Sequence, residues 1–233
     1  MIKALTKLTA LFARRNNKAF VTWLRKHGAQ IGSNTTFINC LHASVDSRRL
    51  KYLNIGDNCV ICSGVSLILH DYSWYVLGNE YQELYPSGGQ PIEIGSNVFV
   101  GAHSLILGNT KIGDNVIIAA GSVVKGTLSS NMVYGGNPVK PIMSLDEYRE
   151  RRKAKYIDDA KREVQYFQNR FGRSPDRNEM KNYAVLFNDT KEDISENTLG
   201  FARGYYKKLC KNTASPYENY DVFLETCKLN NDQ

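Results

Sequence analysis

The sequence predicts a mostly β protein: a coil of short parallel strands, preceded by an N-terminal helix and followed by an α-helical C-terminal extension. Three observations predict this fold. An aliphatic residue opens each six-residue row through the middle of the chain. The first 27 residues are basic and carry apolar residues at helical spacing. After residue 143 the rows give way to charged segments with helix-start signals.

The clearest rows begin at Ile94 and read IGSNVF, VGAHSL, ILGNTK, IGDNVI, IAAGSV and VKGTLS. Their opening residues are all aliphatic: Ile94, Val100, Ile106, Ile112, Ile118 and Val124. The same pattern appears upstream in rows opened by Ile55, Ile61 and Leu67, and in a partial row from Ile31. An α-helix would need apolar residues every three to four positions. The rows therefore predict short flat strands, three to a coil, whose aliphatic residues stack into a buried column.

Residues 71–91 interrupt the rows. A long excursion from a tightly periodic coil is often functional. This one begins in the stretch VSLILHDYSWY, where an apolar run ends at His70 and Asp71 before a cluster of aromatic residues. From these residues alone, His70 fits a catalytic base, a metal ligand or a structural histidine at a strand end.

The rows resemble those of the hexapeptide-repeat acyltransferases, which include galactoside, maltose and capsular polysaccharide O-acetyltransferases. The resemblance covers about residues 28–143, and its end, IAAGSVVKGTLSSNMVYGGNPVKPI, is similar to the family's closing coil and its Gly136-Asn137-Pro138 exit. It implies a left-handed parallel β-helix, although strand crossovers in general are right-handed. It also implies a homotrimer with active sites between subunits, and acetyl-CoA as cosubstrate with no metal.

The resemblance places the catalytic histidine where a coil gives way to an extended loop, which is the position of His70. The implied mechanism is direct transfer, in which His70 removes the proton of an acceptor hydroxyl as the oxygen attacks the thioester. Asp71 is a candidate for orienting the imidazole. The alternative for Asp71 is a loop-start residue that binds its own backbone.

Positions that match the family's CoA contacts are Phe99, Ala102, Ala120, Lys125 and Lys140. The resemblance implies that Phe99 packs beside the pantetheine, where the family often has Trp, and that the backbones of Ala102 and Ala120 meet the pantetheine amides. Lys125 departs from the family, which often has a small hydroxyl residue there. Both lysines would offer positive charge to the CoA phosphates. The alternatives are turn packing for Phe99 and a solvated side chain for Lys140.

The acceptor is expected to be a saccharide, because the aromatic residues after His70 offer stacking faces for sugar rings. The candidate acceptor contacts are Asn39, His42, Tyr72 and Trp74. We therefore predict an acetyl-CoA-dependent O-acetyltransferase acting on a saccharide hydroxyl of a bacterial surface polysaccharide or its precursor.

Three other functions fit parts of the pattern. One is an N-acetyltransferase acting on a nucleotide-linked amino sugar, or an antibiotic acetyltransferase. Another is a trimeric scaffold without activity. The third, a γ-class carbonic anhydrase, needs three zinc-binding histidines, and His70 and His103 lack such a partner. His103 is therefore expected to be structural or to line the pocket.

Composition limits the possible disulfides, partners and cellular location of the protein. The five cysteines are odd in number and scattered, which argues against a disulfide framework. Cys59 and Cys62 lie inside repeat rows and are expected to be buried. The net charge is +7, yet no nucleic-acid-binding motif occurs, so no nucleic acid partner is expected. No apolar run approaches the roughly 20 residues of a membrane span, which predicts a cytoplasmic protein.

Both ends of the chain are predicted to be helical. Residues 1–27 contain no acid and form a basic amphipathic helix, which covers the open end of the coil and can also lie on an anionic inner membrane. In the extension, 144–233, Ser144-Leu145-Asp146-Glu147 opens a helix that reaches about Arg170. Ser174-Pro175 opens a second, a third spans about 195–210, and Ser215-Pro216 opens a fourth.

Overall fold

The computed structural model describes residues 9, 11–188, 209 and 212–228 of the 233-residue chain. The chain divides into two compact units, Met1–Tyr148 and Arg149–Gln233. The first unit contains all of the repeat rows, and the second contains most of the C-terminal extension.

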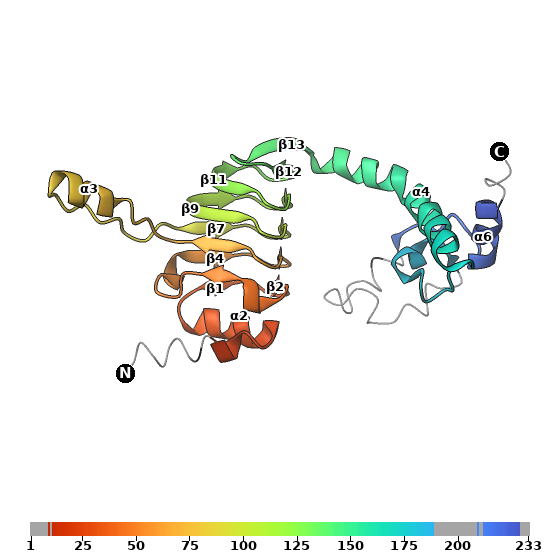
Figure 1. Cartoon of the computed structure of the whole chain (residues 1–233), viewed down its shortest axis with the longest axis horizontal. Coiled ribbons are helices and arrows are strands. Elements are labelled where there is room, and N and C mark those ends of the chain that lie inside the picture. The colour runs from red at the N-terminus through yellow and green to blue at the C-terminus, as the bar shows by residue number, and fades with distance from the viewer. Residues whose placement is uncertain (1–8, 10, 189–208, 210–211, 229–233) are drawn as a thin grey trace. The chain divides into compact units, whose positions relative to one another are not determined.

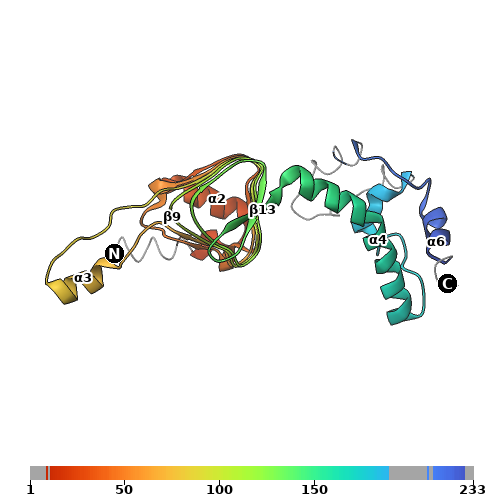
Figure 2. The same ribbon diagram turned by 90° about the horizontal axis from the view of Figure 1, so that it is seen from above.

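The first unit is a stack of coils of short parallel strands (Figures 1 and 2). One face consists of β1 (Gln30–Ile31), β4 (Leu53–Ile55), β7 (Ile92–Ile94) and the last residues of β9 (Leu105–Ile112) and β11 (Val123–Leu128). The second face consists of β2 (Thr36–Phe37), β5 (Val60–Ile61), β8 (Phe99–Val100), β10 (Ile117–Ile118) and β12 (Met132–Gly135). The third consists of β3 (Ser44–Val45), β6 (Ser66–Ile68) and the first residues of β9 and β11. The predicted coil of parallel strands is therefore confirmed. The stack ends at β13 (Lys140–Ser144), which runs antiparallel to β12.

The aliphatic column is also confirmed. The six row-opening residues from Ile94 to Val124 are at most 4% exposed. The fifth residue of each row, from Val98 to Leu128, is buried as well. Burial on this scale is the main favourable term in the folding of the coil.

Asparagines form the corner between the first and second faces. Asn34, Asn58, Asn97, Asn115 and Asn131 all have left-handed backbone conformations, with φ between 55° and 61°. Asparagine accepts this conformation more readily than most residues. Asn97 Nδ2 donates to Asn115 Oδ1 over 2.8 Å, and Asn115 Nδ2 donates to Asn131 Oδ1 over 2.9 Å. This asparagine ladder is the physical reason for the GSN and GDN tripeptides that recur in the rows.

The N-terminal cap is α2 (Asn17–Lys26), which covers the first coil. Phe20, Val21, Trp23 and Leu24 are buried in the same core as the strands. The prediction that a helix closes the coil is confirmed for α2. The expectation of one helix over residues 1–27 needs correction, because the chain turns at residues 14–16 and Asn16 then caps the new helix by accepting from Ala19 N over 2.9 Å. Residues 1–8 and 10 lie outside the described residues.

The excursion between β6 and β7 stands away from the coils and carries α3 (Trp74–Tyr81), as Figures 1 and 2 show. None of the residues of α3 is buried. The base of the excursion is closed by three hydrogen bonds. Gln90 N donates to Leu69 O over 2.9 Å, Ser87 Oγ donates to Asp71 O over 2.6 Å, and Asp71 N donates to Ser87 Oγ over 3.3 Å. The point where it leaves the coil is thus fixed by the backbone beside His70.

The second unit has a small core of its own. It is built from α4 (Leu145–Phe171), the 3₁₀ helix η3 (Lys181–Leu186) and α6 (Tyr220–Lys228). The buried residues of its main cluster are Ala160, Val164, Met180, Leu186, Phe187, Tyr220 and Phe223. None of the helices within the described ranges has the length and hydropathy of a bilayer-spanning segment.

Of the helix starts predicted for the extension, one is confirmed, one is wrong and one is displaced. The start of α4 is confirmed, because Ser144 Oγ accepts from Glu147 N over 3.1 Å. The helix predicted from Ser174-Pro175 is wrong: residues 177–180 form turns, and the 3₁₀ helix η3 follows from Lys181. The fourth helix begins at Tyr220 rather than at Ser215-Pro216, because Asn219 provides the cap. The predicted helix at 195–210 falls almost entirely outside the described residues.

Candidate active site

His70 lies at the corner between the third and first faces, where the excursion leaves the coil. It follows β6 and the fully buried Leu69. The backbone of Leu69 is held by Gln90 N. The position of His70 is therefore set by a buried strand end on one side and the closed base of the excursion on the other.

The imidazole of His70 contacts a carboxylate through one nitrogen and leaves the other accessible. Nδ1 lies 2.8 Å from Asp46 Oδ2 and is shielded from solvent. The oxygen lies off the N–H direction, so the contact is a close electrostatic pair rather than an aligned hydrogen bond. The His70 side chain is 21% exposed, and Nε2 has no hydrogen-bond partner in the part of the chain that the structure describes. Nε2 is thus the nitrogen that can meet a substrate.

Asp46 comes from the coil below and is itself held in place. It follows β3, whose Val45 pairs with Leu67 of β6. Its Oδ1 accepts from Arg48 N over 3.0 Å, and its Oδ2 accepts from Arg49 Nη1 over 3.1 Å. Burial acts to raise the pKa of the Asp46 carboxyl, but the bonds from Arg48 and Arg49 and the nearby His70 outweigh it and lower this pKa below its ordinary value. An ionised carboxylate at Nδ1 favours the tautomer with the proton on Nδ1 and the lone pair on Nε2.

Tyr72 completes this cluster. Its ring packs edge-on against the His70 ring, with centroids 4.3 Å apart. The Arg49 guanidinium lies over the Tyr72 ring, 6.0 Å from its centroid. The imidazole is thus held by Asp46 and Tyr72, and Arg49 touches both of those neighbours. We call these four residues the His70 cluster.

Of the two alternatives for Asp71, the geometry matches the loop-start residue that binds nearby backbone. Its Oδ1 accepts from Ser73 N over 2.6 Å, at the start of α3. This backbone hydrogen bond is the main reason why the pKa of the Asp71 carboxyl is lowered. The carboxylate in contact with His70 is that of Asp46, which the sequence pattern does not connect with the histidine. The signal that could have found it is the coil length, because β3 and β6 pair Ser44 with Ser66 and so set residue 46 beside residue 68.

The positions predicted for CoA amides lie at another corner, between the second and third faces. Ala102 and Ala120 occupy equivalent turns of successive coils, and Gly121 N donates to Ala102 O over 2.8 Å. Within the described residues, the backbone N–H groups of Ala102 and Ala120 have no acceptor. Both can therefore donate to amide carbonyls of a ligand, which is the property that a pantetheine chain needs from this corner.

His103 shapes the same corner. It has φ 58°, and its ring lies against Gly64 of the coil below. Gly64 has φ 75°, and a Cβ there would overlap the His103 ring. The predicted structural or pocket-lining position of His103 fits this packing, and Gly64 is needed both for its backbone conformation and for space.

The remaining predicted CoA contacts lie on neighbouring elements. Phe99 of β8 is 40% exposed and lines a hollow of about 280 Å³. Lys140 is exposed at the start of β13. Lys125 lies instead at the corner of His70, where its charge acts on the Asp71 carboxylate. Within one chain, the corner of Ala102 and the corner of His70 lie at opposite ends of the third face, about 20 Å apart at the rise of a strand.

The predicted acceptor contacts are spread over the same two corners. Tyr72 packs on His70, and Trp74 begins α3 with its ring 6.3 Å from that of Tyr75. Asn39 precedes the 3₁₀ helix η1 (Cys40–His42), on which His42 is exposed. The structure thus brings Tyr72 to the imidazole and leaves Asn39 and His42 at the opposite corner of the coil.

The described residues contain no group of three or more His, Cys, Asp or Glu side chains that could hold a metal ion. Cys59 is fully buried and Cys62 is half-buried. Burial raises the pKa of both thiols, which disfavours the thiolate form that a nucleophile needs. Cys210 lies outside the described residues.

Comparison with known proteins decides the family. A family model described as bacterial transferase hexapeptide (six repeats) matches residues 91–126, and one described as hexapeptide repeat of succinyl-transferase matches residues 53–68. Protein CapG of Staphylococcus aureus is 35% identical over 126 residues, which cover 54% of this chain and 71% of that protein. The chain belongs to the hexapeptide-repeat transferase family. The resemblance seen in the rows is thereby confirmed.

Two further relatives have names that state an activity. The putative acetyltransferase YvoF of Bacillus subtilis is 29% identical over 142 residues, which cover 61% of this chain and 74% of that protein. The galactoside O-acetyltransferase of Escherichia coli is 35% identical over 95 residues, which cover 41% of this chain and 45% of that protein. The protein is an acyltransferase, as predicted.

Solved structures include a serine acetyltransferase from Brucella abortus in complex with coenzyme A. It is 28% identical, with a TM-score of 0.39, and the match covers 50% of this chain and 40% of that one. The chain therefore spans less than half of that enzyme.

Proposed function

We propose that this hexapeptide-repeat acyltransferase moves an acetyl group from acetyl-CoA to a hydroxyl of a saccharide, with His70 as the general base. One observation carries the proposal. The buried Nδ1 of His70 faces an ionised carboxylate, and its Nε2 is accessible beside an aromatic excursion. An imidazole held in this way has the lone pair that proton abstraction needs.

The chain's own residues account for the proton transfers. The acceptor hydroxyl donates a hydrogen bond to His70 Nε2, and its proton moves to Nε2 as the oxygen attacks the thioester carbonyl. The Asp46 carboxylate stabilises the imidazolium that forms. When the carbon–sulfur bond breaks, His70 returns the proton to the departing sulfur. The imidazole ends neutral, and no covalent enzyme intermediate is formed.

Acetyl-CoA supplies the activated acetyl thioester. We assign its pantetheine arm to the corner of Ala102 and Ala120, because their backbone N–H groups lack acceptors. Phe99 offers an exposed aromatic face close to that corner. Lys140 and Lys125 are exposed lysines available to its phosphates.

The two corners call for a second copy of the chain. Within one chain, the donors of Ala102 and Ala120 and the base His70 lie at opposite ends of the third face, so one active site cannot use both. We infer a homotrimer of left-handed coils, in which His70 of one subunit meets the Ala102 corner of the next.

A saccharide is the acceptor class that the excursion supports best. Tyr72, Tyr75, Tyr81 and Tyr85 are all more than half exposed. Aromatic faces of this kind stack on the apolar faces of sugar rings, and their hydroxyl groups add hydrogen bonds. A relative that acts on galactosides points the same way. We extend this to a bacterial surface polysaccharide or its precursor, acetylated in the cytoplasm.

The test is thiol release from acetyl-CoA with a panel of free sugars, oligosaccharides and amines. We expect release that depends on a saccharide, and a loss of roughly 100- to 10,000-fold in kcat for His70→Ala. His27→Gln, which changes a histidine at the end of α2, is the matched control and should keep its activity. Mass spectrometry of the product identifies the acceptor. Unchanged release in His70→Ala would exclude His70 as the base, and transfer to amines alone would exclude the saccharide.

A further inference from the structure

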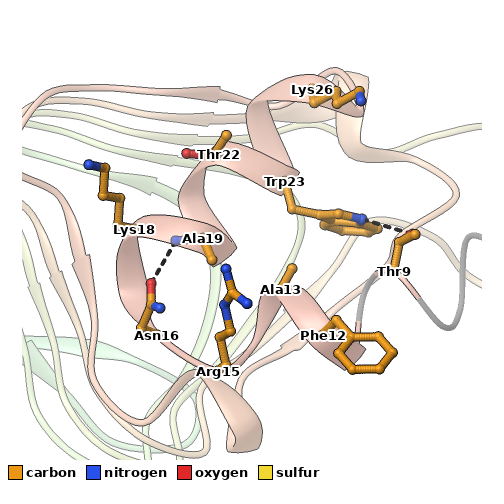
Figure 3. A pocket seen from close by; sticks show the side chains of 10 residues that line it. All are labelled: Thr9, Phe12, Ala13, Arg15, Asn16, Lys18, Ala19, Thr22, Trp23 and Lys26. Carbon is orange, nitrogen blue, oxygen red and sulfur yellow. Dashed lines mark hydrogen bonds between the residues drawn. The ribbon is translucent and has the colours of Figure 1, made fainter.

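The N-terminal cap contains a cavity of about 600 Å³, larger than the hollow beside Phe99 (Figure 3). It lies between α2 and the short helical segment of residues 11–13. The proposed acetyl transfer uses none of its residues. Its chemistry therefore has to be considered separately.

The cavity has an apolar side. Phe12, Ala13, Ala19 and Trp23 line it. Trp23 is 9% exposed, and its Nε1 donates to Thr9 Oγ1 over 3.4 Å (Figure 3). Phe12 is 66% exposed and the adjacent Leu11 is 61% exposed. Two neighbouring large apolar side chains in solvent are unfavourable by themselves and indicate a surface that binds something apolar.

The rest of the lining is polar and includes three cations. Arg15, Lys18 and Lys26 border the cavity. Lys18, Thr22 and Lys26 are spaced by four, so they lie along one face of α2. The opposite face, with Phe20 and Leu24, is buried in the coil core. One helix face thus builds the fold and the other presents charge to the cavity.

These three cations differ from Arg14 and Arg25, the other arginines in the described residues of the cap, which serve the structure. Arg14 donates to the carbonyl oxygens of Cys40 and Ala43. Arg25 donates to those of Ile31 and Gly32. In the described ranges, the side chains of Arg15, Lys18 and Lys26 make no hydrogen bond or ion pair. Their charges are therefore available to a ligand.

Among the described residues, no carboxylate forms an ion pair with Arg15, Lys18 or Lys26. The first 45 residues of the chain contain neither Asp nor Glu. The first acid is Asp46, which is already engaged by His70 and Arg49. Three uncompensated cations beside an apolar wall produce a positive potential that favours an anion.

We propose that this cavity binds an anionic phospholipid and so holds the protein at a membrane surface. The phosphate is bound by Arg15, Lys18 and Lys26, and the acyl chain lies along Phe12 and Trp23. A free phosphate would use only the cations and would leave the exposed Phe12 and Leu11 unexplained. A ligand with an anionic head and an apolar chain uses both. The site needs no acetyl-CoA, so it does not depend on the proposed acetyl transfer.

The experiment uses the full chain and a built-in reporter. The protein has two tryptophans, Trp23 and Trp74, so Trp74→Phe leaves Trp23 as the only indole. The probes are vesicles of equimolar phosphatidylglycerol and phosphatidylcholine, and vesicles of phosphatidylcholine alone. We expect co-sedimentation with the anionic vesicles only, weaker at higher salt. Phosphatidylglycerol brominated on its acyl chains should quench Trp23 emission.

Charge reversal separates this site from general electrostatics. The combined variant R15E/K18E/K26E should weaken vesicle binding about tenfold or more. The matched control K153E/K155E/K181E changes the net charge equally in the second unit and should bind within about twofold of the parent. Phe12→Ser should reduce quenching by the brominated lipid. If the triple variant does not fold, Arg15→Gln and Phe12→Ser give the same comparison singly.

Several results would overturn the proposal. Equal losses of vesicle binding in the two triple variants would show that net charge, not this site, drives binding. Equal binding to neutral vesicles would show that the anionic headgroup is not recognised. If inorganic phosphate changes the Trp23 emission but brominated lipid does not quench it, the cavity binds free anions rather than a lipid. His70→Ala should bind vesicles like the parent, so failure of the catalytic proposal and failure of this one are distinguishable.

Discussion

His70 and Asp46 belong to neighbouring coils and meet because the register of the coil stacks the ends of β3 and β6. Neither residue is sufficient alone. Without the carboxylate, the buried Nδ1 of His70 would face no acceptor among the described residues. Without the two bonds from Arg48 and Arg49, burial would push the Asp46 carboxyl towards its neutral form. The chemistry of His70 therefore depends on residues from two neighbouring coils.

The first prediction separates two carboxylates next to the same histidine. Asp46→Asn should lower kcat by roughly 100-fold, because the imidazolium loses its counter-charge, while the KM for acetyl-CoA stays unchanged. Asp46→Glu should recover much of the rate. Asp71→Asn should cost less, since the Asp71 carboxylate binds the Ser73 backbone. Steady-state kinetics at saturating acceptor measure all three variants. A larger loss in Asp71→Asn than in Asp46→Asn would return the orienting position to Asp71.

At the scale of elements, the asparagine ladder explains how coils stack without long side chains at their corner. Each asparagine supplies a left-handed backbone, and the amides of Asn34, Asn97 and Asn115 donate to the asparagine of the next coil. Asn115 has a bond on either side, from Asn97 and to Asn131. The ladder should therefore be most sensitive at this central rung.

The second prediction tests that rung. Asn115→Ala should destabilise the first unit by about 2 kcal/mol, because it adds left-handed backbone strain to the loss of two amide bonds. Asn115→Gly removes the amide but keeps the backbone conformation, so its loss should be smaller. Urea unfolding followed by Trp23 emission, with Trp74→Phe in every variant, measures both. Equal losses for Ala and Gly would show that the backbone conformation contributes nothing.

The third prediction concerns pH and the second unit. Arg173 donates through both terminal nitrogens to Glu179, at 2.9 Å each, and Asp176 N donates to it over 2.7 Å. These bonds lower the pKa of Glu179 from 4.5 to about 2, and the bond from Arg173 contributes most. A carboxyl with a lowered pKa stabilises the fold above its unfolded pKa and loses this as pH falls through the folded value. The contribution should therefore be complete at pH 6 and fade between about pH 4.5 and pH 2.

Glu179→Gln tests this contribution. The variant should be less stable than the parent at pH 6, and the gap should close as the pH approaches 2. Arg173→Gln is the partner control and should behave similarly. Circular dichroism melts across this range provide the measurement. Parallel stability curves for parent and variants would show that the clamp is not linked to folding.

At the scale of the whole molecule, the sequence predicts what repeats locally and misses what depends on distant pairing. The row-opening residues from Ile94 to Val124 are predicted and buried, because each row carries its own pattern. Asp46 precedes His70 by a full coil, so only the register of β3 and β6 connects them. The helix expected from Ser174-Pro175 does not form, and turns followed by the 3₁₀ helix η3 take its place. The cavity of the cap combines residues on two sides of a turn that no periodicity reveals.

The fourth prediction asks whether one active site is shared between chains. Alone, His70→Ala lacks the base, and Ala120→Glu blocks the exposed corner assigned to the pantetheine arm, so both variants should be inactive. Mixed oligomers contain interfaces in which an intact His70 from one chain faces an intact Ala120 from another. Co-expression should therefore restore part of the activity, because the two corners lie at opposite ends of the third face within any single chain.

The measurement is thiol release by the co-purified, differently tagged pair. Light scattering should give about three times the 26.3 kDa chain mass for each preparation. The matched control is co-expression of His70→Ala with Asp46→Asn. Both substitutions affect the His70 corner, where each chain supplies His70 and Asp46 together. In that mixture an intact His70 is always paired with a defective Asp46, so activity should not exceed that of Asp46→Asn alone. Recovery in the first pair and none in the second would mean that each site takes its base from one subunit and its CoA corner from the next. No recovery in either pair, in a proven mixed oligomer, would contradict the shared site.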